Sequence, residues 1–120
     1  MIEAYIYSSC ISCRKTEQVL KDSGTAYESR DYFRKRFSRD ELKEILDNAG
    51  LNVSDVLSKR SKVYKARGAE IDALSADELL ALMVEEPTLL RRPLVIGEGG
   101  VLVGHNPAKL GALIEANTAS

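Results

Sequence analysis

The stretch IEAYIYSSCISCRKTEQVL, residues 2–20, changes character halfway along its length. Residues 2–8 (IEAYIYS) are rich in β-branched and aromatic residues, which favours a β-strand. The residues that follow the first cysteine fit a helix, for which Gly24 is a suitable C-terminal stop. Both cysteines of the chain, Cys10 and Cys13, therefore lie where an expected strand turns into an expected helix.

The composition is that of one compact domain. Its 120 residues, 44% of them hydrophobic, suffice for a single core, because a chain of this length buries roughly two thirds of its unfolded surface.

The 17 lysines and arginines nearly balance the 18 acidic residues, so the net charge of -1 gives no overall attraction to nucleic acid or anionic membranes. The first nine residues lack the basic start and long apolar run of a signal peptide. We therefore expect a cytoplasmic protein that binds neither membranes nor nucleic acid directly.

Cap and turn residues mark the elements in the middle of the chain. Residues 25–33 (TAYESRDYF) fit a second strand. Two capping boxes, Ser38 with Glu41 and Ser75 with Glu78, predict the starts of two helices. The cation-rich segment between these helices fits short helices and connections.

Two short apolar runs near the C-terminus predict a β-hairpin. The runs are residues 94–96 and 101–103, joined by the segment GEGG at residues 97–100. Because the glycines lead into a second strand and not into a helix, they do not predict a nucleotide-binding loop. Asn106 as N-cap and Pro107 at the first helical position then begin a last helix.

The order of the expected elements is βαβ, several helices, then ββα. This order matches an α/β fold with a thioredoxin-like mixed sheet and an inserted helical subdomain. We expect a single domain over residues 1–120, with the thioredoxin-like core at about 1–35 and 88–117 and the helical insert at about 36–87.

A C-x-x-C pair at the start of a helix is the arrangement of redox-active thiols. Cys10 meets the unpaired N–H groups and the positive end of the helix dipole, which stabilise a thiolate, and Arg14 adds a nearby cation. Cys10 is therefore the expected nucleophile. Cys13, about one turn further on, can attack a mixed intermediate on Cys10 and close a disulfide, which makes it the expected resolving thiol.

Other roles for the two cysteines compete with redox chemistry. A structural disulfide would close a very short loop and would be unusual in a reducing cytosol. Buried free thiols can also serve simply as small apolar groups. A zinc site would need His105, the only histidine, and a carboxylate, and no second C-x-x-C or H-x-x-H motif is present. The spacing favours redox chemistry, and we expect no metal.

Four motifs are spread over almost the entire chain: CISCRK at residues 10–15, SKRSKVYK at 58–65, LLRRPLVI at 89–96 and VGHNPAKL at 103–110. In this order and spacing they resemble the arsenate reductase (ArsC) and Spx family. The C-x-x-C motif alone is weakly specific, but its combination with RSK and RRP is strongly so. The family has a thioredoxin-like fold with an inserted helical subdomain, in agreement with the order of elements above.

The resemblance implies a set of site residues. It places Cys10 at the family's catalytic or redox-sensing cysteine, Arg60 at a central arginine and Arg92 at the arginine before the hairpin proline. Guanidinium groups match tetrahedral oxyanions such as arsenate bidentately, so Arg14, Arg60 and Arg92 are the expected oxyanion-binding residues. Arg60 lies in a charged run, which is also typical of a solvated face. A cis peptide bond at Pro93 would place Arg92 beside Cys10.

The chain departs from both branches of this family. The reductases carry a histidine where this chain has Ile6 and an arginine where it has His105, whereas Cys13 fits the regulatory branch, typified by Spx. Ser9 and protonated His105 are the accessory candidates for a reductase. Two features count against the Spx branch. Asn52 occupies the position at which Spx has a glycine of its polymerase contact, and we expect no counterpart of that branch's longer basic tail.

These observations together favour a thiol-dependent oxidoreductase that resembles the ArsC reductases and reduces arsenate to arsenite, with Cys10 as nucleophile and Cys13 as resolving thiol. No bound cofactor is expected, and electrons would come from glutathione with glutaredoxin, or from thioredoxin. The alternative is a Spx-type regulator that binds RNA polymerase through its α-subunit and uses the Cys10–Cys13 disulfide as a redox switch.

Overall fold

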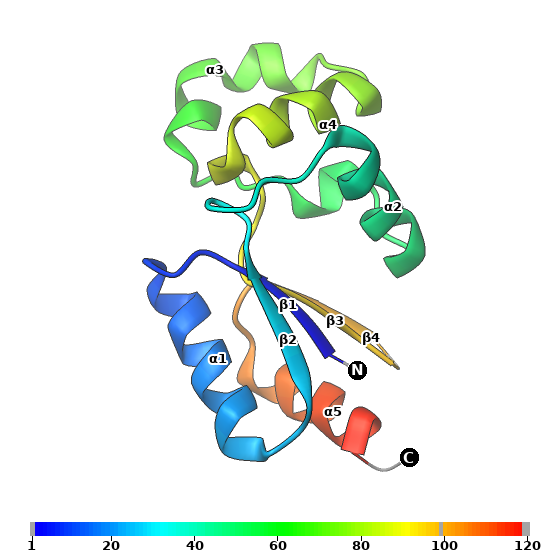
Figure 1. Ribbon diagram of the computed structural model, residues 1–120. Helices are drawn as coiled ribbons and strands as arrows, with labels where there is room; N and C mark the ends of the chain where they lie inside the picture. Colours follow the sequence, from blue (N-terminus) through cyan, green and yellow to red (C-terminus); the bar gives the residue numbers. More distant parts are fainter. Residues whose placement is uncertain (1, 99, 119–120) are drawn as a thin grey trace. The chain divides into compact units, whose positions relative to one another are not determined.

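The computed structural model describes residues 2–98 and 100–118, and the chain forms two compact units (Figure 1). The first, which we call the sheet unit, comprises the residues up to Lys35 and those from Arg92 onward, and the second, the helical unit, comprises Arg36–Arg91. Gly99 of the predicted hairpin turn and the end of the predicted tail lie outside the described residues. No helix in the described ranges is both long and apolar enough to cross a membrane.

The sheet unit holds a mixed four-stranded sheet. Its elements are β1 (Ile2–Ile6), α1 (Ile11–Ser23), β2 (Tyr27–Asp31), β3 (Leu94–Gly97), β4 (Gly100–Val103) and α5 (Pro107–Thr118). The strand order is β2-β1-β3-β4, in which β1 runs parallel to β2 and antiparallel to β3, and β3 and β4 form the predicted hairpin. This topology confirms the predicted α/β, thioredoxin-like fold.

Both helices of the sheet unit pack on the same face of its sheet. Side chains alternate along β1, so that Ile2, Ala4 and Ile6 face a buried apolar cluster. The rest of this cluster comes from both helices and from β3 and β4, namely Cys13, Leu20, Val95, Leu102, Leu110 and Leu113. Cys13 is therefore a core residue, whereas Cys10 packs only against the edge of the cluster.

The helical unit is built from short helices, as predicted for the middle of the chain. Its elements are α2 (Arg39–Ala49), η1 (Val53–Val56), α3 (Lys62–Asp72), α4 (Ala76–Glu85) and η2 (Pro87–Leu89), where η denotes a 3-10 turn. Ser38 Oγ accepts a hydrogen bond from Glu41 N–H at 3.1 Å, and the Ser75–Glu78 box forms in both directions. The two helix starts predicted from these residues are confirmed.

The stretch at residues 88–91, which the sequence assigned to the sheet core, is bonded to the helical unit. Ser58 N–H donates to the Leu89 carbonyl oxygen at 2.7 Å, and Arg91 N–H donates to the Val56 carbonyl oxygen at 2.8 Å. The chain therefore re-enters the sheet unit at Arg92, directly before β3.

The helix α5 is fixed at both ends by asparagine side chains. Asn106 caps its start, and Pro107 occupies the first helical position, as predicted. Near its end, the Asn117 amide bonds to both backbone groups of Glu98 in the hairpin, at 3.2 and 3.1 Å. A Cβ atom on Gly97 would lie 2.8 Å from Asn117 Nδ2, so a side chain at that position would displace the Asn117 amide.

Candidate functional site

Cys10 occupies the N-cap position of α1, at the end of a tight turn after β1. Its N–H donates to the Tyr7 carbonyl oxygen at 2.9 Å, and its carbonyl oxygen accepts from Arg14 N–H at 3.0 Å. The Cys10 side chain is half-buried, and both cysteines are free thiols. The strand end and the helix start therefore hold this sulfur at the edge of the core.

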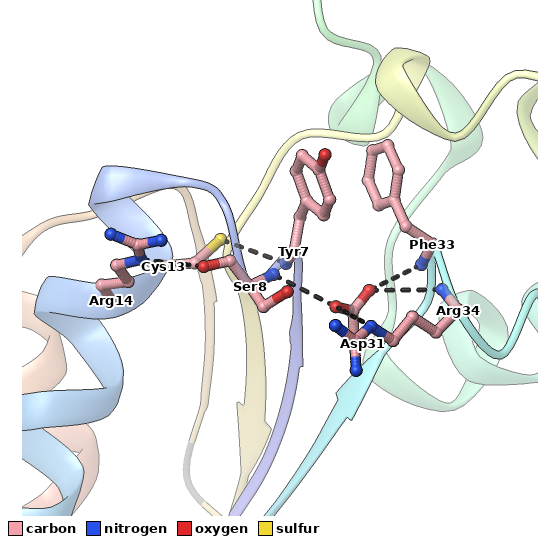
Figure 2. Close-up of polar contacts among 7 residues, drawn as sticks. All are labelled: Tyr7, Ser8, Cys13, Arg14, Asp31, Phe33 and Arg34. Carbon is pink, nitrogen blue, oxygen red and sulfur yellow. Dashed lines mark hydrogen bonds and ion pairs between the residues drawn. The ribbon is translucent and has the colours of Figure 1, made fainter.

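The two thiols differ in their affinity for a proton. Burial of Cys13, which has no exposed surface, raises its pKa to about 12, although Tyr7 N–H donates to its sulfur at 3.5 Å (Figure 2). Burial also acts to raise the pKa of Cys10, but the backbone N–H and thiol of Cys13 and the Arg92 guanidinium outweigh it and lower that pKa. The site thus favours a thiolate on Cys10 more than on Cys13. Their roles as nucleophile and resolving thiol stay predictions.

Arg92 is the cation that the structure brings to Cys10. It lies directly before β3, its peptide bond to Pro93 is cis, and its side chain is half-buried. Burial acts to lower the pKa of Arg92, but side-chain hydrogen bonding and charge attraction to Cys10 and Tyr32 raise it. The guanidinium is therefore placed to form a partly buried ion pair with a thiolate on Cys10 at the start of α1.

The other predicted cations are placed differently. Arg14 is exposed, and its Nε donates to the Ser8 carbonyl oxygen at 2.8 Å, which fastens the turn before Cys10 (Figure 2). Ser9 is exposed within that turn. Arg60 is exposed in the helical unit, next to Ser61, whose side chain caps α3. The oxyanion-binding roles of Arg14 and Arg60 and the accessory role of Ser9 stay predictions.

His105 is bonded to the buried side of α1. Its Nδ1 lies 2.8 Å from Oγ1 of Thr16, a residue with no exposed surface. This contact links the turn before α5 to the helix that begins after Cys10. The accessory role of His105 toward an oxyanion stays a prediction. Across residues 2–98 and 100–118, no group of three or more His, Cys, Asp and Glu side chains could hold a metal ion.

Replacing His105 with phenylalanine is expected to destabilise the protein by about 1–3 kcal/mol, because the buried Thr16 hydroxyl loses its partner. The free energy of unfolding in urea measures this loss. The double variant His105→Phe with Thr16→Val should recover most of it, since both polar groups are then gone. Equal stability of His105→Phe and the unmodified protein would show that the contact contributes nothing.

Asp31, at the end of β2, holds the turn before Cys10, although the sequence did not predict it as a site residue. Its Oδ2 accepts from Ser8 N–H at 3.2 Å, and its Oδ1 accepts from Phe33 N–H at 2.9 Å and Arg34 N–H at 3.3 Å (Figure 2). The parallel pairing of β1 and β2 brings the two strand ends to one edge of the sheet. A charged residue near the end of the second expected strand was therefore the available signal.

Stability is expected to depend on the ionisation of Asp31 in acid. Burial acts to raise its pKa, but hydrogen bonds from Ser8 and from the N–H groups of Phe33 and Arg34 outweigh it and lower that pKa. A lowered pKa means that the carboxylate stabilises the folded state at neutral pH, and that this contribution is lost as the pH falls below about 3.9.

The comparison of Asp31→Asn with the unmodified protein tests this expectation. The difference in their free energies of unfolding should be largest near neutral pH and should shrink as the pH falls through that acid window. Asp22→Asn, which alters an exposed carboxylate on α1, is the control for the loss of one negative charge. A difference between Asp31→Asn and the unmodified protein that stays constant with pH would contradict the role of this carboxylate.

Known proteins match the chain over almost its full length. The sequence profile of the ArsC family matches residues 5–113. The regulatory protein MgsR of Bacillus subtilis is 36% identical over 114 residues, which cover 95% of this chain and 90% of MgsR. The global transcriptional regulator Spx of Listeria innocua is 36% identical, over 88% of this chain and 81% of Spx. A solved arsenate reductase from Vibrio cholerae is 29% identical with a TM-score of 0.80, over 93% of this chain and 96% of the reductase.

Proposed function

Because the chain belongs to the ArsC family, we propose that it is a thiol-dependent oxidoreductase that reduces arsenate or a similar oxyanion. The observation that carries this proposal is the pairing of a Cys10 thiol of lowered pKa with the Arg92 guanidinium, beside a buried thiol on Cys13. The likeness to a solved arsenate reductase supports an oxyanion as the substrate. No bound cofactor takes part in the proposed reaction.

In the first step, the Cys10 thiolate attacks the arsenic atom of arsenate and forms a sulfur–arsenic bond. One arsenate oxygen leaves as hydroxide and is protonated to water. Arg92 stabilises the negative charge on the remaining oxygens, because guanidinium groups donate to tetrahedral oxyanions in a fork geometry. In this proposal Arg14 and Arg60 supply further donors, and Ser9 and His105 are accessory residues.

In the second step, the Cys13 sulfur attacks the sulfur of Cys10, and a disulfide forms as the sulfur–arsenic bond breaks. The electron pair of that bond stays on arsenic, which leaves as arsenite and takes up the proton of Cys13. Two electrons have then passed from the two thiols to arsenic. Thioredoxin, or glutathione with glutaredoxin, supplies two electrons to reopen the disulfide.

The regulators among the relatives favour a second candidate function. MgsR and Spx are each 36% identical to the chain. A disulfide switch needs two thiols, and the chain has Cys13 in addition to Cys10. In this alternative, a peroxide oxidises the Cys10 thiolate to a sulfenic acid, and Cys13 displaces water to close the disulfide. The disulfide would then control binding to the α-subunit of RNA polymerase.

An assay of arsenate-dependent NADPH oxidation separates the two functions. Thioredoxin with its reductase, and glutathione with glutaredoxin and its reductase, are supplied in separate reactions, and reactions without arsenate are the controls. Turnover with either donor system supports the reductase. No turnover with either system, together with binding of the isolated polymerase α-subunit domain, would overturn the reductase in favour of the regulator.

A further inference from the structure

Three aromatic side chains of the sheet unit lie around the Arg92 guanidinium. Tyr7 follows β1, and Tyr32 and Phe33 follow β2, so the parallel pairing of these strands brings all three to one edge of the sheet. The rings of Tyr7 and Phe33 stack with centroids 3.8 Å apart and planes 20° apart, and Figure 2 shows them side by side. The Tyr32 ring lies against Phe33, with centroids 5.0 Å apart.

The stacked rings shield the Arg92 guanidinium more than they attract it. Its central carbon lies 5.5 Å from the ring centroid of Tyr7 and also 5.5 Å from that of Phe33. A cation equally distant from two stacked centroids lies beside the stack and not over the face of one ring, where the ring quadrupole attracts cations most strongly. The stack therefore acts mainly as an apolar wall that keeps water from the guanidinium.

The stacked rings of Tyr7 and Phe33 do not fix the position of the Arg92 guanidinium, which depends instead on the contacts of its terminal nitrogen atoms. Within the described part of the chain, Arg92 Nε is buried and has no hydrogen-bond partner. Side-chain hydrogen bonds join Arg92 to Cys10 and to Tyr32. Tyr32 is only 2% exposed, and its hydroxyl oxygen offers an acceptor that does not depend on the state of Cys10.

We propose that Tyr32 is a positioning residue of the thiol centre: its hydroxyl fixes the Arg92 guanidinium against Cys10, while the Tyr7–Phe33 stack shields that guanidinium from water. The proposal rests on the proposed role of Cys10 as a thiolate, and it adds residues that the reaction steps above do not use. The charged and titratable groups that act on Cys10 include Cys13 from α1 and Arg92 from the segment before β3, and Cys10 in turn acts on Tyr32 from the segment after β2.

The variant Tyr32→Phe removes the hydroxyl and keeps the ring. The rate at which iodoacetamide alkylates Cys10, assigned by peptide mass spectrometry, is followed as a function of pH. The acid dissociation constant of Cys10 is expected to fall about three- to tenfold, which moves the midpoint of the profile up by about half to one pH unit. Tyr27→Phe is the matched control, since its hydroxyl bonds to Glu17 at 3.2 Å, and its profile should not move.

A double variant distinguishes positioning from a general loosening of the fold. If Tyr32 acts through Arg92, adding Tyr32→Phe to Arg92→Gln should cause no further shift of the Cys10 midpoint. A full additional shift in that background would overturn the proposal. It would also be overturned if Arg92→Gln moved the midpoint while Tyr32→Phe left it unchanged, an outcome that spares the proposed function.

Failure of both variants to move the midpoint would instead contradict the ion pair on which the proposed function depends. Should Tyr32→Phe fail to fold, as judged by circular dichroism, Phe33→Leu provides the second test. This change opens the apolar wall to water and is expected to move the Cys10 midpoint upward, though by less than Arg92→Gln. An unchanged midpoint in folded Phe33→Leu would count against the proposal.

Discussion

Replacing Cys10 with serine is expected to abolish arsenate reduction, whereas replacing Cys13 with serine is expected to stop the reaction one step later. Serine at position 10 keeps the shape of the side chain but is not ionised at neutral pH, so no nucleophile remains. The loss in kcat should be on the order of 10⁶-fold, as for removal of the nucleophile in other covalent mechanisms, which in practice is no detectable turnover.

The Cys13→Ser variant serves as the matched comparison. Cys13 is fully buried and its pKa is raised to about 12, so it is not the nucleophile of the first step and its loss should spare that step. It should still form the arsenic adduct on Cys10, and mass spectrometry of the intact protein would detect that adduct. A small external thiol could then release arsenite in place of Cys13, at a lower rate. Measurable turnover in Cys10→Ser, at more than about a tenth of the unmodified rate, would assign the chemistry to another residue.

Replacing Arg92 with glutamine is expected to lower kcat/KM for arsenate by about 100- to 1000-fold, the range observed when one oxyanion-stabilising donor is removed. Glutamine keeps much of the length and the donor capacity of the side chain but removes its charge. The same change should raise the pKa of Cys10, because the guanidinium lowers it in the folded protein. The activity of the variant should therefore recover in part as the pH is raised.

Arg91→Gln is the control for this prediction, because Arg91 is the preceding residue and is exposed. Its backbone N–H donates to Val56, and that bond does not depend on the side chain. Kinetic constants for both variants, measured at several pH values with the same donor system, provide the test. Equal losses in the two variants would show that the effect is one of general charge and not of the contact with Cys10.

Much of the fold could be predicted because its signals are local. The Ser75–Glu78 capping box, Gly24 after α1 and the Asn106–Pro107 start of α5 each act within a few residues, and the structure confirms all three. The strand, cysteine turn and helix at the N-terminus follow from composition and spacing in the same way. The order of these elements then restricts the sheet to a thioredoxin-like topology.

The surroundings of Cys10 could be predicted only in part, because they depend on contacts between distant segments. Spacing along the chain pointed to Arg14 as the neighbouring cation, whereas Arg92, which the structure joins to Cys10, was predicted only through the family resemblance and the proline that follows it. Asp31 and Tyr32 carried no motif and became visible only through the parallel pairing of β1 and β2. Their place could be inferred only once that strand order was known.

The most direct test of the central claim is the pH dependence of Cys10 alkylation in the unmodified protein and in Arg92→Gln. An ordinary cysteine titrates near pH 8.5. We predict a midpoint below that value for the unmodified protein and a higher midpoint for the variant. A midpoint at or above about 8.5 that is the same in both proteins would contradict the account of Cys10 as a thiolate held by Arg92.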